Sequence, residues 1–166
     1  MDIDGDLTVT AGELAMGSNN ADVASNKTVD IDGTLSISSG TFTANGPTDI
    51  DGTLSITTTG VYDADDSFTA SGGNITFGGA GFLKCSSTVS SLGTMNDDYG
   101  TVVYDRADGG TQNVKPDNYY NLTIDGNGTH QIGNSSPAFN VLGDLVVNET
   151  GSTVFSVATV SYTHLT

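Results

Sequence analysis

The stretch Asp30-Ile31-Asp32-Gly33-Thr34-Leu35-Ser36-Ile37 is one of three related copies in this chain of 166 residues. The other two copies are Asp2-Ile3-Asp4-Gly5-Asp6-Leu7-Thr8-Val9 and Asp49-Ile50-Asp51-Gly52-Thr53-Leu54-Ser55-Ile56. A weaker fourth copy spans Asn140 to Val147. The first three copies begin 28 and then 19 residues apart (30 − 2 and 49 − 30). Recurrence at such spacings is typical of a solenoid.

Within each copy, apolar residues occupy alternate positions on both sides of a glycine. In the second copy, Ile31 precedes the glycine, and Leu35 and Ile37 follow it. This is the period of a strand with one buried face, bent at the glycine. We call one circuit of the chain a rung. Equivalent copies stacked about 4.8 Å apart bury their aliphatic side chains inside, and their backbones pair with those of the neighbouring rungs. The sequence therefore predicts an all-β protein, a right-handed parallel β-helix (β-solenoid).

The composition favours one narrow solenoid domain. Hydrophobic residues make up 36 % of the chain, tryptophan is absent, and Glu occurs only as Glu13 and Glu149. The scarcity of good helix formers argues against helices. We expect a single domain over residues 1–162 and an irregular tail over 163–166. Because solenoids usually end in atypical capping repeats and none is recognisable, we expect an uncapped fragment of a longer array.

Charge and cysteine content exclude several classes of function. Four basic residues against twenty acidic ones give a formal net charge of −16. Nucleic acid is therefore not an expected partner, since phosphate binding needs clustered Lys and Arg. No stretch reaches the roughly 18 apolar residues of a membrane span, so membrane insertion is not expected. Cys85 is the only cysteine, which excludes a disulfide framework and indicates a small core or strand residue.

The outward aspartates of the three strong copies form the candidate metal site. Stacked carboxylates about 5 Å apart in water repel by about 0.8 kcal/mol, and a bound divalent cation would reverse that sign. Two interpretations stay open: an exposed acidic region, or Ca²⁺ held between rungs by several oxygen ligands. The candidate ligands are Asp2, Asp4, Asp30, Asp32, Asp49 and Asp51.

Two segments resemble calcium-binding motifs, but each lacks a residue that the motif requires. Asp2 to Glu13 has an acidic twelfth position, as an EF-hand loop does, but Leu7 occupies the sixth position, where that loop requires glycine. Gly78 to Leu83 begins like a calcium-binding nonapeptide, but Leu83 stands where an aspartate must bind the metal. Glycine corners explain this second segment.

An enzymatic alternative is a carbohydrate-active β-helix of the polysaccharide-lyase type, which gathers acids and a base on one face. The only mixed cluster is Asp105, Arg106, Asp108 and Lys115. A polar turn with incidental charges is the commoner cause of such a cluster, so we expect no enzyme. We also expect His130 and His164 to be isolated, which leaves a Ser-His-Asp triad without support.

A third alternative is an ice-binding solenoid, because hydroxyl residues recur at outward positions. The pairs are Thr8-x-Thr10, Ser36-x-Ser38 and Ser55-x-Thr57. A flat array of this kind would present regularly spaced hydroxyls. The columns mix Ser with Thr and lie beside acidic columns, which weakens this interpretation.

The second half of the chain carries a recurring block. It consists of 100–104, Gln112-Asn113-Val114, 119–124 and 141–145. The block resembles repeat regions of large Bacteroidota surface proteins exported by type IX secretion, which are adhesin-like β-solenoids. The resemblance covers roughly residues 30–150 and implies extracellular display at the cell surface, with a role in adhesion or structural spacing. It supplies no catalytic residues.

These observations together predict an extracellular structural or adhesin-like solenoid module. The expected partners are a carbohydrate or other cell-surface ligand. Further copies of the chain are also expected partners, added end to end into a filament, because open sheet edges template strand pairing.

Overall fold

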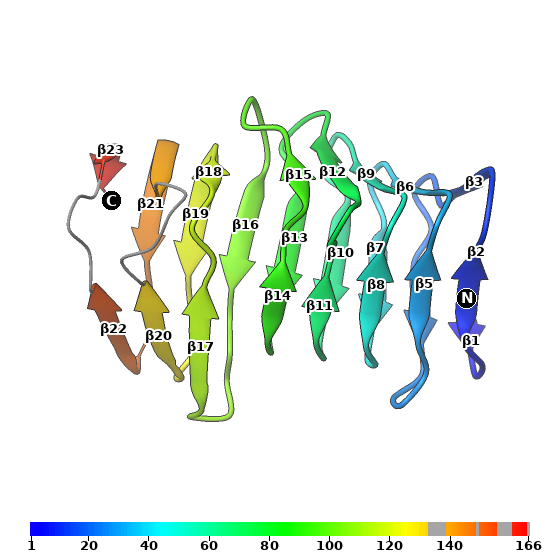
Figure 1. Cartoon of the computed structure of the whole chain (residues 1–166), viewed down its shortest axis with the longest axis horizontal. Coiled ribbons are helices and arrows are strands. Elements are labelled where there is room, and N and C mark those ends of the chain that lie inside the picture. The colour runs from blue at the N-terminus through cyan, green and yellow to red at the C-terminus, as the bar shows by residue number, and fades with distance from the viewer. Residues whose placement is uncertain (133–138, 149, 156–160, 166) are drawn as a thin grey trace.

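The computed structural model describes residues 1–132, 139–148, 150–155 and 161–165 as a parallel β-solenoid. Every described strand pair is parallel, and none of the described residues is helical. The part of the chain described thus contains no apolar helix of the length that a membrane span requires. The chain coils along its long axis from β1 (Asp2–Ile3) to β23 (Ser161–Leu165) (Figure 1). The predicted all-β solenoid is confirmed.

One ten-stranded sheet, sheet A, runs the length of the solenoid. Its continuity comes from one strand in almost every rung pairing with its neighbours on both sides. Its strands are β1, β4 (Ala21–Val23), β7 (Thr41–Ala44), β10 (Val61–Ala64), β13 (Phe82–Cys85), β16 (Thr101–Tyr104), β18 (Asn118–Tyr119), β19 (Asn121–Ile124), β21 (Asn140–Val147) and β23.

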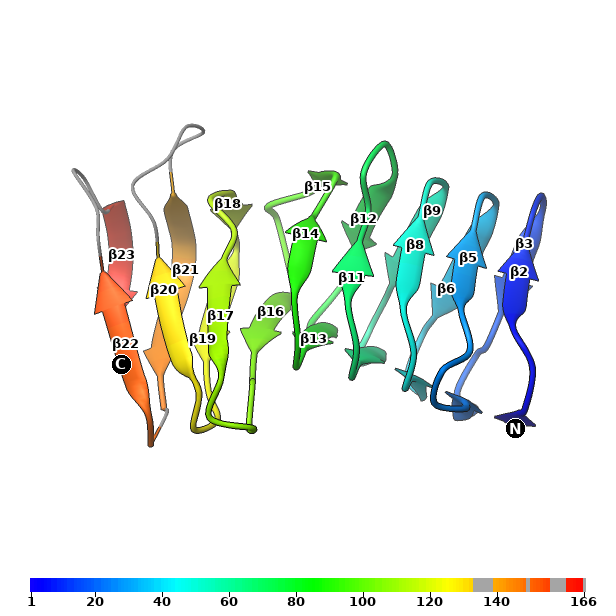
Figure 2. The same ribbon diagram turned by 60° about the horizontal axis from the view of Figure 1, so that its bottom comes forward.

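Three smaller sheets complete the walls (Figures 1 and 2). Sheet B consists of β2 (Leu7–Val9), β5 (Val29–Ile31), β8 (Thr48–Ile50), β11 (Phe68–Thr69) and β14 (Val89–Ser91). Sheet C consists of β3 (Glu13–Ala15), β6 (Thr34–Ile37), β9 (Thr53–Ile56), β12 (Asn74–Phe77) and β15 (Thr94–Met95). Sheet D consists of β17 (Thr111–Val114), β20 (Thr129–Ile132) and β22 (Ser152–Phe155).

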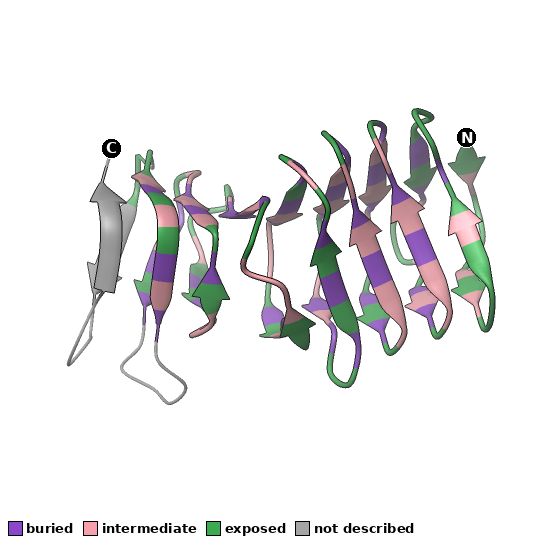
Figure 3. Ribbon diagram, turned by 90° about the horizontal axis from the view of Figure 1, so that it is seen from above, coloured by how far each residue is buried: buried purple, intermediate pink, exposed green. Residues whose placement is uncertain are grey.

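The second and third sequence copies stack residue on residue. Ile31 lies over Ile50 in sheet B, and Leu35 lies over Leu54 in sheet C. All four side chains are fully buried. Figure 3 shows the resulting alternation of buried and exposed segments along the strands. The stacking predicted from the repeat is therefore confirmed for these two copies.

The first copy is out of step with the other two, contrary to the sequence-based expectation. Val9, not Ile3, pairs with Ile31, which is a shift of six residues (9 − 3). Ile3 instead pairs with Val23 in sheet A. The physical reason is that a strand–glycine–strand pattern suits any corner of the coil, so the motif alone does not say which corner it forms.

The fourth copy and the tail also differ from expectation. The fourth copy has no corner at Gly143, because β21 runs as one strand in sheet A and places Leu145 beside Leu122. The expected irregular tail over 163–166 overlaps a strand, since β23 reaches Leu165 and pairs with β21. Residue 166 lies outside the described residues.

The cross-section changes between β14 and β17. Up to that point, short corners such as Ser86 to Thr88 join sheet A to sheet B. The next corner is longer, from Asp105 to Gly110, and within the described part of the chain β17 pairs with β20 rather than with β14. In the same region Tyr104 occupies the interior column that Ala64 and Cys85 fill in earlier rungs. The longer corner and the larger side chain together reshape the interior.

Candidate functional site

The six predicted metal ligands do not form a single array. Asp30 lies directly beside Asp49 on the outer face of sheet B, and Asp32 and Asp51 follow them at the corner into sheet C. Asp2 belongs to sheet A, where it pairs with Asp22, and Asp4 follows it in the chain. The six-residue shift of the first copy is the reason for this separation.

The four aspartates that stay together repel one another. Burial raises the pKa of the Asp49 carboxyl, and the negative charges of Asp51, Asp30 and Asp32 raise it further. Across the described residues, no group of three or more His, Cys, Asp or Glu side chains is placed to hold a metal ion. Calcium binding by the remaining four carboxylates stays a prediction.

The predicted hydroxyl array lies on the outer face of sheet C, but only in part. Ser36 stacks beside Ser55, and Ser55 beside Thr76. A second column is formed by Thr34 and Thr53 in the same sheet. Thr8, which was expected to continue the array, lies in sheet B and pairs with Asp30. The array is therefore shorter than the sequence suggests.

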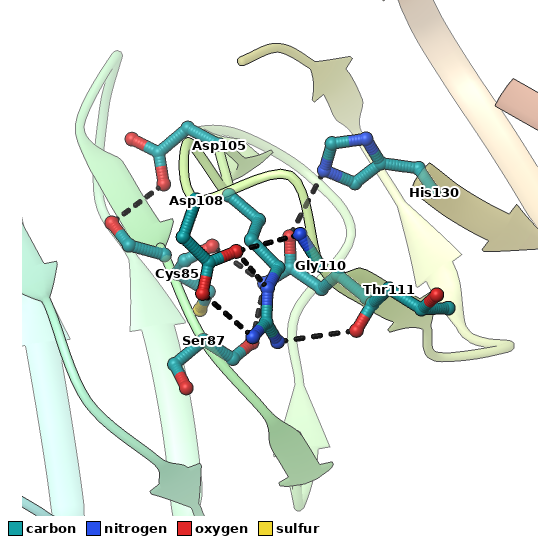
Figure 4. Close-up of polar contacts among 10 residues, drawn as sticks. Cys85, Ser87, Asp105, Asp108, Gly110, Thr111 and His130 are labelled. Atoms are coloured by element: carbon teal, nitrogen blue, oxygen red, sulfur yellow. Dashed lines mark hydrogen bonds and ion pairs between the residues drawn. The ribbon is translucent and has the colours of Figure 1, made fainter. Parts of the chain in front are cut away.

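The mixed charge cluster divides into separate contacts (Figure 4). The Arg106 guanidinium donates to both carboxylate oxygens of Asp108, from Nε to Oδ1 at 2.6 Å and from Nη2 to Oδ2 at 2.9 Å. Its Nη1 donates to the Thr111 carbonyl at 3.1 Å. The Arg106 pairing lowers the pKa of the Asp108 carboxyl to about 2. This ion pair holds the surface turn between Arg106 and Thr111 in place.

The other two members of the cluster have different neighbours. Asp105 accepts a hydrogen bond from Ser86 Oγ at 2.9 Å, and burial raises the pKa of its carboxyl. Lys115 contributes backbone contacts, as its amide donates to the Tyr104 hydroxyl at 3.1 Å and its carbonyl accepts from the Tyr119 hydroxyl at 2.5 Å. These contacts join Asp105 and Lys115 to neighbours outside the cluster.

A buried polar network lies where the sequence predicted an isolated histidine, and that prediction is wrong. His130 is fully buried and stacks beside Gln112, with His130 Nε2 3.0 Å from Gln112 Oε1. The Gln112 amide nitrogen donates to the carbonyls of Cys85 at 2.7 Å and Ser87 at 2.5 Å. Because that amide end points at two acceptors, the oxygen end must accept, and His130 Nε2 carries the proton. His164 lies in β23, where it pairs with Asp144.

Cys85 is a core residue, as predicted. It is buried and unbonded to another cysteine, and burial raises the pKa of its thiol. A buried thiol held in its neutral form is a poor nucleophile. Cys85 therefore contributes packing.

Comparison with known proteins gave no match for this chain. No protein-family model, no curated protein and no solved structure matches the chain.

Proposed function

We propose that the chain is an extracellular structural module, adhesin-like in role, that forms part of a surface protein. The observation that carries this proposal is sheet A, whose ten strands run through the whole described length in parallel register. A wall of this kind makes a stiff element that grows by about 4.8 Å for each rung. Such an element suits the separation of a binding surface from the surface that carries it.

The distribution of charge supports the same role. The interior is apolar apart from a few hydrogen-bonded polar groups, so the net charge of −16 lies on the outside. A strongly charged exterior keeps an extended protein soluble and disfavours attachment of its copies side by side, while the backbone groups of the sheet edges at the two ends stay available for end-to-end addition. It also favours contacts with neutral or cationic surfaces over contacts with nucleic acid.

An adhesion assay tests the proposal. Beads coated with the folded chain are expected to be retained on immobilised polysaccharides or on cells in 150 mM salt, and beads coated with the heat-unfolded chain are not. Equal retention of both would show nonspecific attachment and contradict the proposal. Unsaturated product from uronic-acid polymers, lost in Arg106→Ala, would establish the lyase alternative instead.

A second candidate function, binding to ice, is favoured by one observation. The hydroxyl columns of sheet C stack in register, with Ser55 between Ser36 and Thr76. Regular hydroxyls on a flat sheet can order water in a lattice. Thermal hysteresis in the wild-type chain, abolished by Ser55→Lys and kept by Thr123→Lys on the outer face of sheet A, would support it. Absence of hysteresis excludes it.

A further inference from the structure

Two exposed tyrosines lie side by side at one corner of the solenoid. Tyr99 precedes β16 and Tyr120 precedes β19, on successive rungs. Their ring centroids are 6.3 Å apart, with a tilt of 49° between the ring planes. The residues are 55 % and 40 % exposed, respectively. Two neighbouring aromatic rings with this much exposure can offer their faces to a binding partner.

Carboxylates flank both tyrosines in the sequence. Asp97 and Asp98 precede Tyr99 in the same loop, and Asp117 lies three residues before Tyr120. Asp97 and Asp117 each lie four residues before a pair of strand partners, Thr101 and Asn121, and the charge of Asp97 adds to burial in raising the pKa of the Asp117 carboxyl. Among the described residues, Arg106 forms its ion pair with Asp108, and Asp97, Asp98 and Asp117 take part in none. The acidic residues around the tyrosines therefore have no basic side chain at salt-bridge distance.

We propose that this corner, formed by Asp97, Asp98, Tyr99, Asp117 and Tyr120, binds an arginine-bearing segment of a partner protein. A guanidinium stacks its flat face on an aromatic ring and donates from its edge to carboxylates. The corner provides both kinds of acceptor within one surface. This inference deepens the proposed adhesive role and rests on it for the need to contact a ligand.

Charge and geometry disfavour the other occupants. A second copy of the chain also carries a net charge of −16 and has only four basic residues to offer. The 49° tilt between the rings gives no common plane on which successive sugar rings of one glycan would stack. A cationic peptide needs only one ring face at a time.

A peptide-binding experiment tests the proposal. The probe is a short, capped, fluorescently labelled peptide with two arginines separated by glycine, titrated with the chain in 150 mM salt and followed by anisotropy. We expect saturable binding that weakens at least fivefold in the double variant Tyr99→Ala/Tyr120→Ala. The double variant Tyr99→Phe/Tyr120→Phe, which keeps both rings, is expected to bind as the wild type does.

Matched charge variants separate this corner from general attraction. Asp97→Asn/Asp117→Asn is expected to weaken binding, whereas Asp30→Asn/Asp49→Asn removes the same charge from sheet B and leaves binding within twofold. Equal loss in both pairs, or no saturable binding, would overturn the proposal. So would glycan binding that the tyrosine variant abolishes. If the peptide binds but coated beads do not adhere, the adhesive function fails; if beads adhere but the peptide does not bind, only this inference fails.

Discussion

The side-chain amide of Gln112 hydrogen-bonds the backbone carbonyl of Cys85 on the preceding rung, at 2.7 Å. The bond lies where sheet B ends and sheet D begins. The long corner from Asp105 to Gly110 precedes a strand that pairs with β20 and not with β14. The Cys85 carbonyl also accepts from the Asp105 backbone amide, and the same Gln112 nitrogen donates to the Ser87 carbonyl, so a side chain provides donors across the place where backbone pairing is interrupted.

Replacement of Gln112 by alanine is expected to lower the free energy of unfolding by about 2–4 kcal/mol. The variant leaves the Ser87 carbonyl and His130 Nε2 without their Gln112 partner and opens a cavity. Gln131→Ala is the control, because that side chain is exposed on the neighbouring strand β20, and we expect a change within about 0.5 kcal/mol. Urea unfolding measures both. Equal losses would mean that the network adds nothing to stability.

The repeat predicted the fold because the alternating apolar residues of each copy need a buried face, and stacking the copies in register provides one. Ile31 and Ile50 occupy equivalent positions in the sequence copies, and stacking the two rungs in register buries them side by side inside the solenoid. The first copy shows the limit of this argument. Its Ile3 has the same local pattern, but the pairing of Val9 with Ile31 depends on the length of chain between corners.

The polar interior was not predictable in the same way. Inward positions are normally apolar, so a lone histidine suggested an isolated residue. A signal did exist: Gln112 and His130 each lie two residues before an inward aliphatic residue, Val114 and Ile132, so both share its phase. Recognising the pair also required knowing that β17 and β20 are neighbours, and no local pattern contains that information.

Close backbone stacking at the aspartate–glycine corners predicts that Gly52→Ala destabilises the chain. An added Cβ would overlap the backbone oxygens of Gly33 and Asp32 on the preceding rung. Because backbone must move to relieve the overlap, we expect a loss of about 1–3 kcal/mol. Gly5→Ala is the matched control, since nothing lies within 4 Å of a Cβ there. A similar melting temperature for the two variants would refute the close stacking.

Replacement of Thr58 by glycine is expected to increase the stability of the folded chain. The backbone of Thr58 has a φ of 54°, in the left-handed region that a β-branched residue disfavours. Thr58→Gly relieves this strain and is expected to raise the free energy of unfolding by about 0.5–1 kcal/mol. Thr59 lies in the same turn but has no positive φ. Thr59→Gly therefore only adds conformational entropy to the unfolded state, and it should lower the free energy of unfolding. Thermal melts of both variants decide, and a loss in Thr58→Gly would rule out the strain.

Half-buried carboxylates predict an unusual dependence of stability on pH. Burial is the main cause of the raised pKa of Asp63, Asp105 and Asp117. A carboxyl whose pKa is higher in the folded chain binds its proton first in the folded state. Acidification from pH 7 through that folded pKa, toward the ordinary value of 3.8, therefore adds stability. The opposite sign applies to Asp108, whose contribution is lost only below 3.8, as the pH falls toward its pKa of about 2.

We accordingly expect the melting temperature to rise as the pH is lowered from 7 through pH 5 toward the isoelectric point of 4.1. Asp105→Asn should make this rise smaller, because asparagine removes the buried charge while its side-chain oxygen still accepts the hydrogen bond from Ser86. Asp108→Asn should leave the rise between pH 7 and pH 5 intact, since Asp108 is ionised throughout that range in both states. A melting temperature that falls from pH 7 to pH 5 in the wild type would show that these carboxylates are not desolvated by folding.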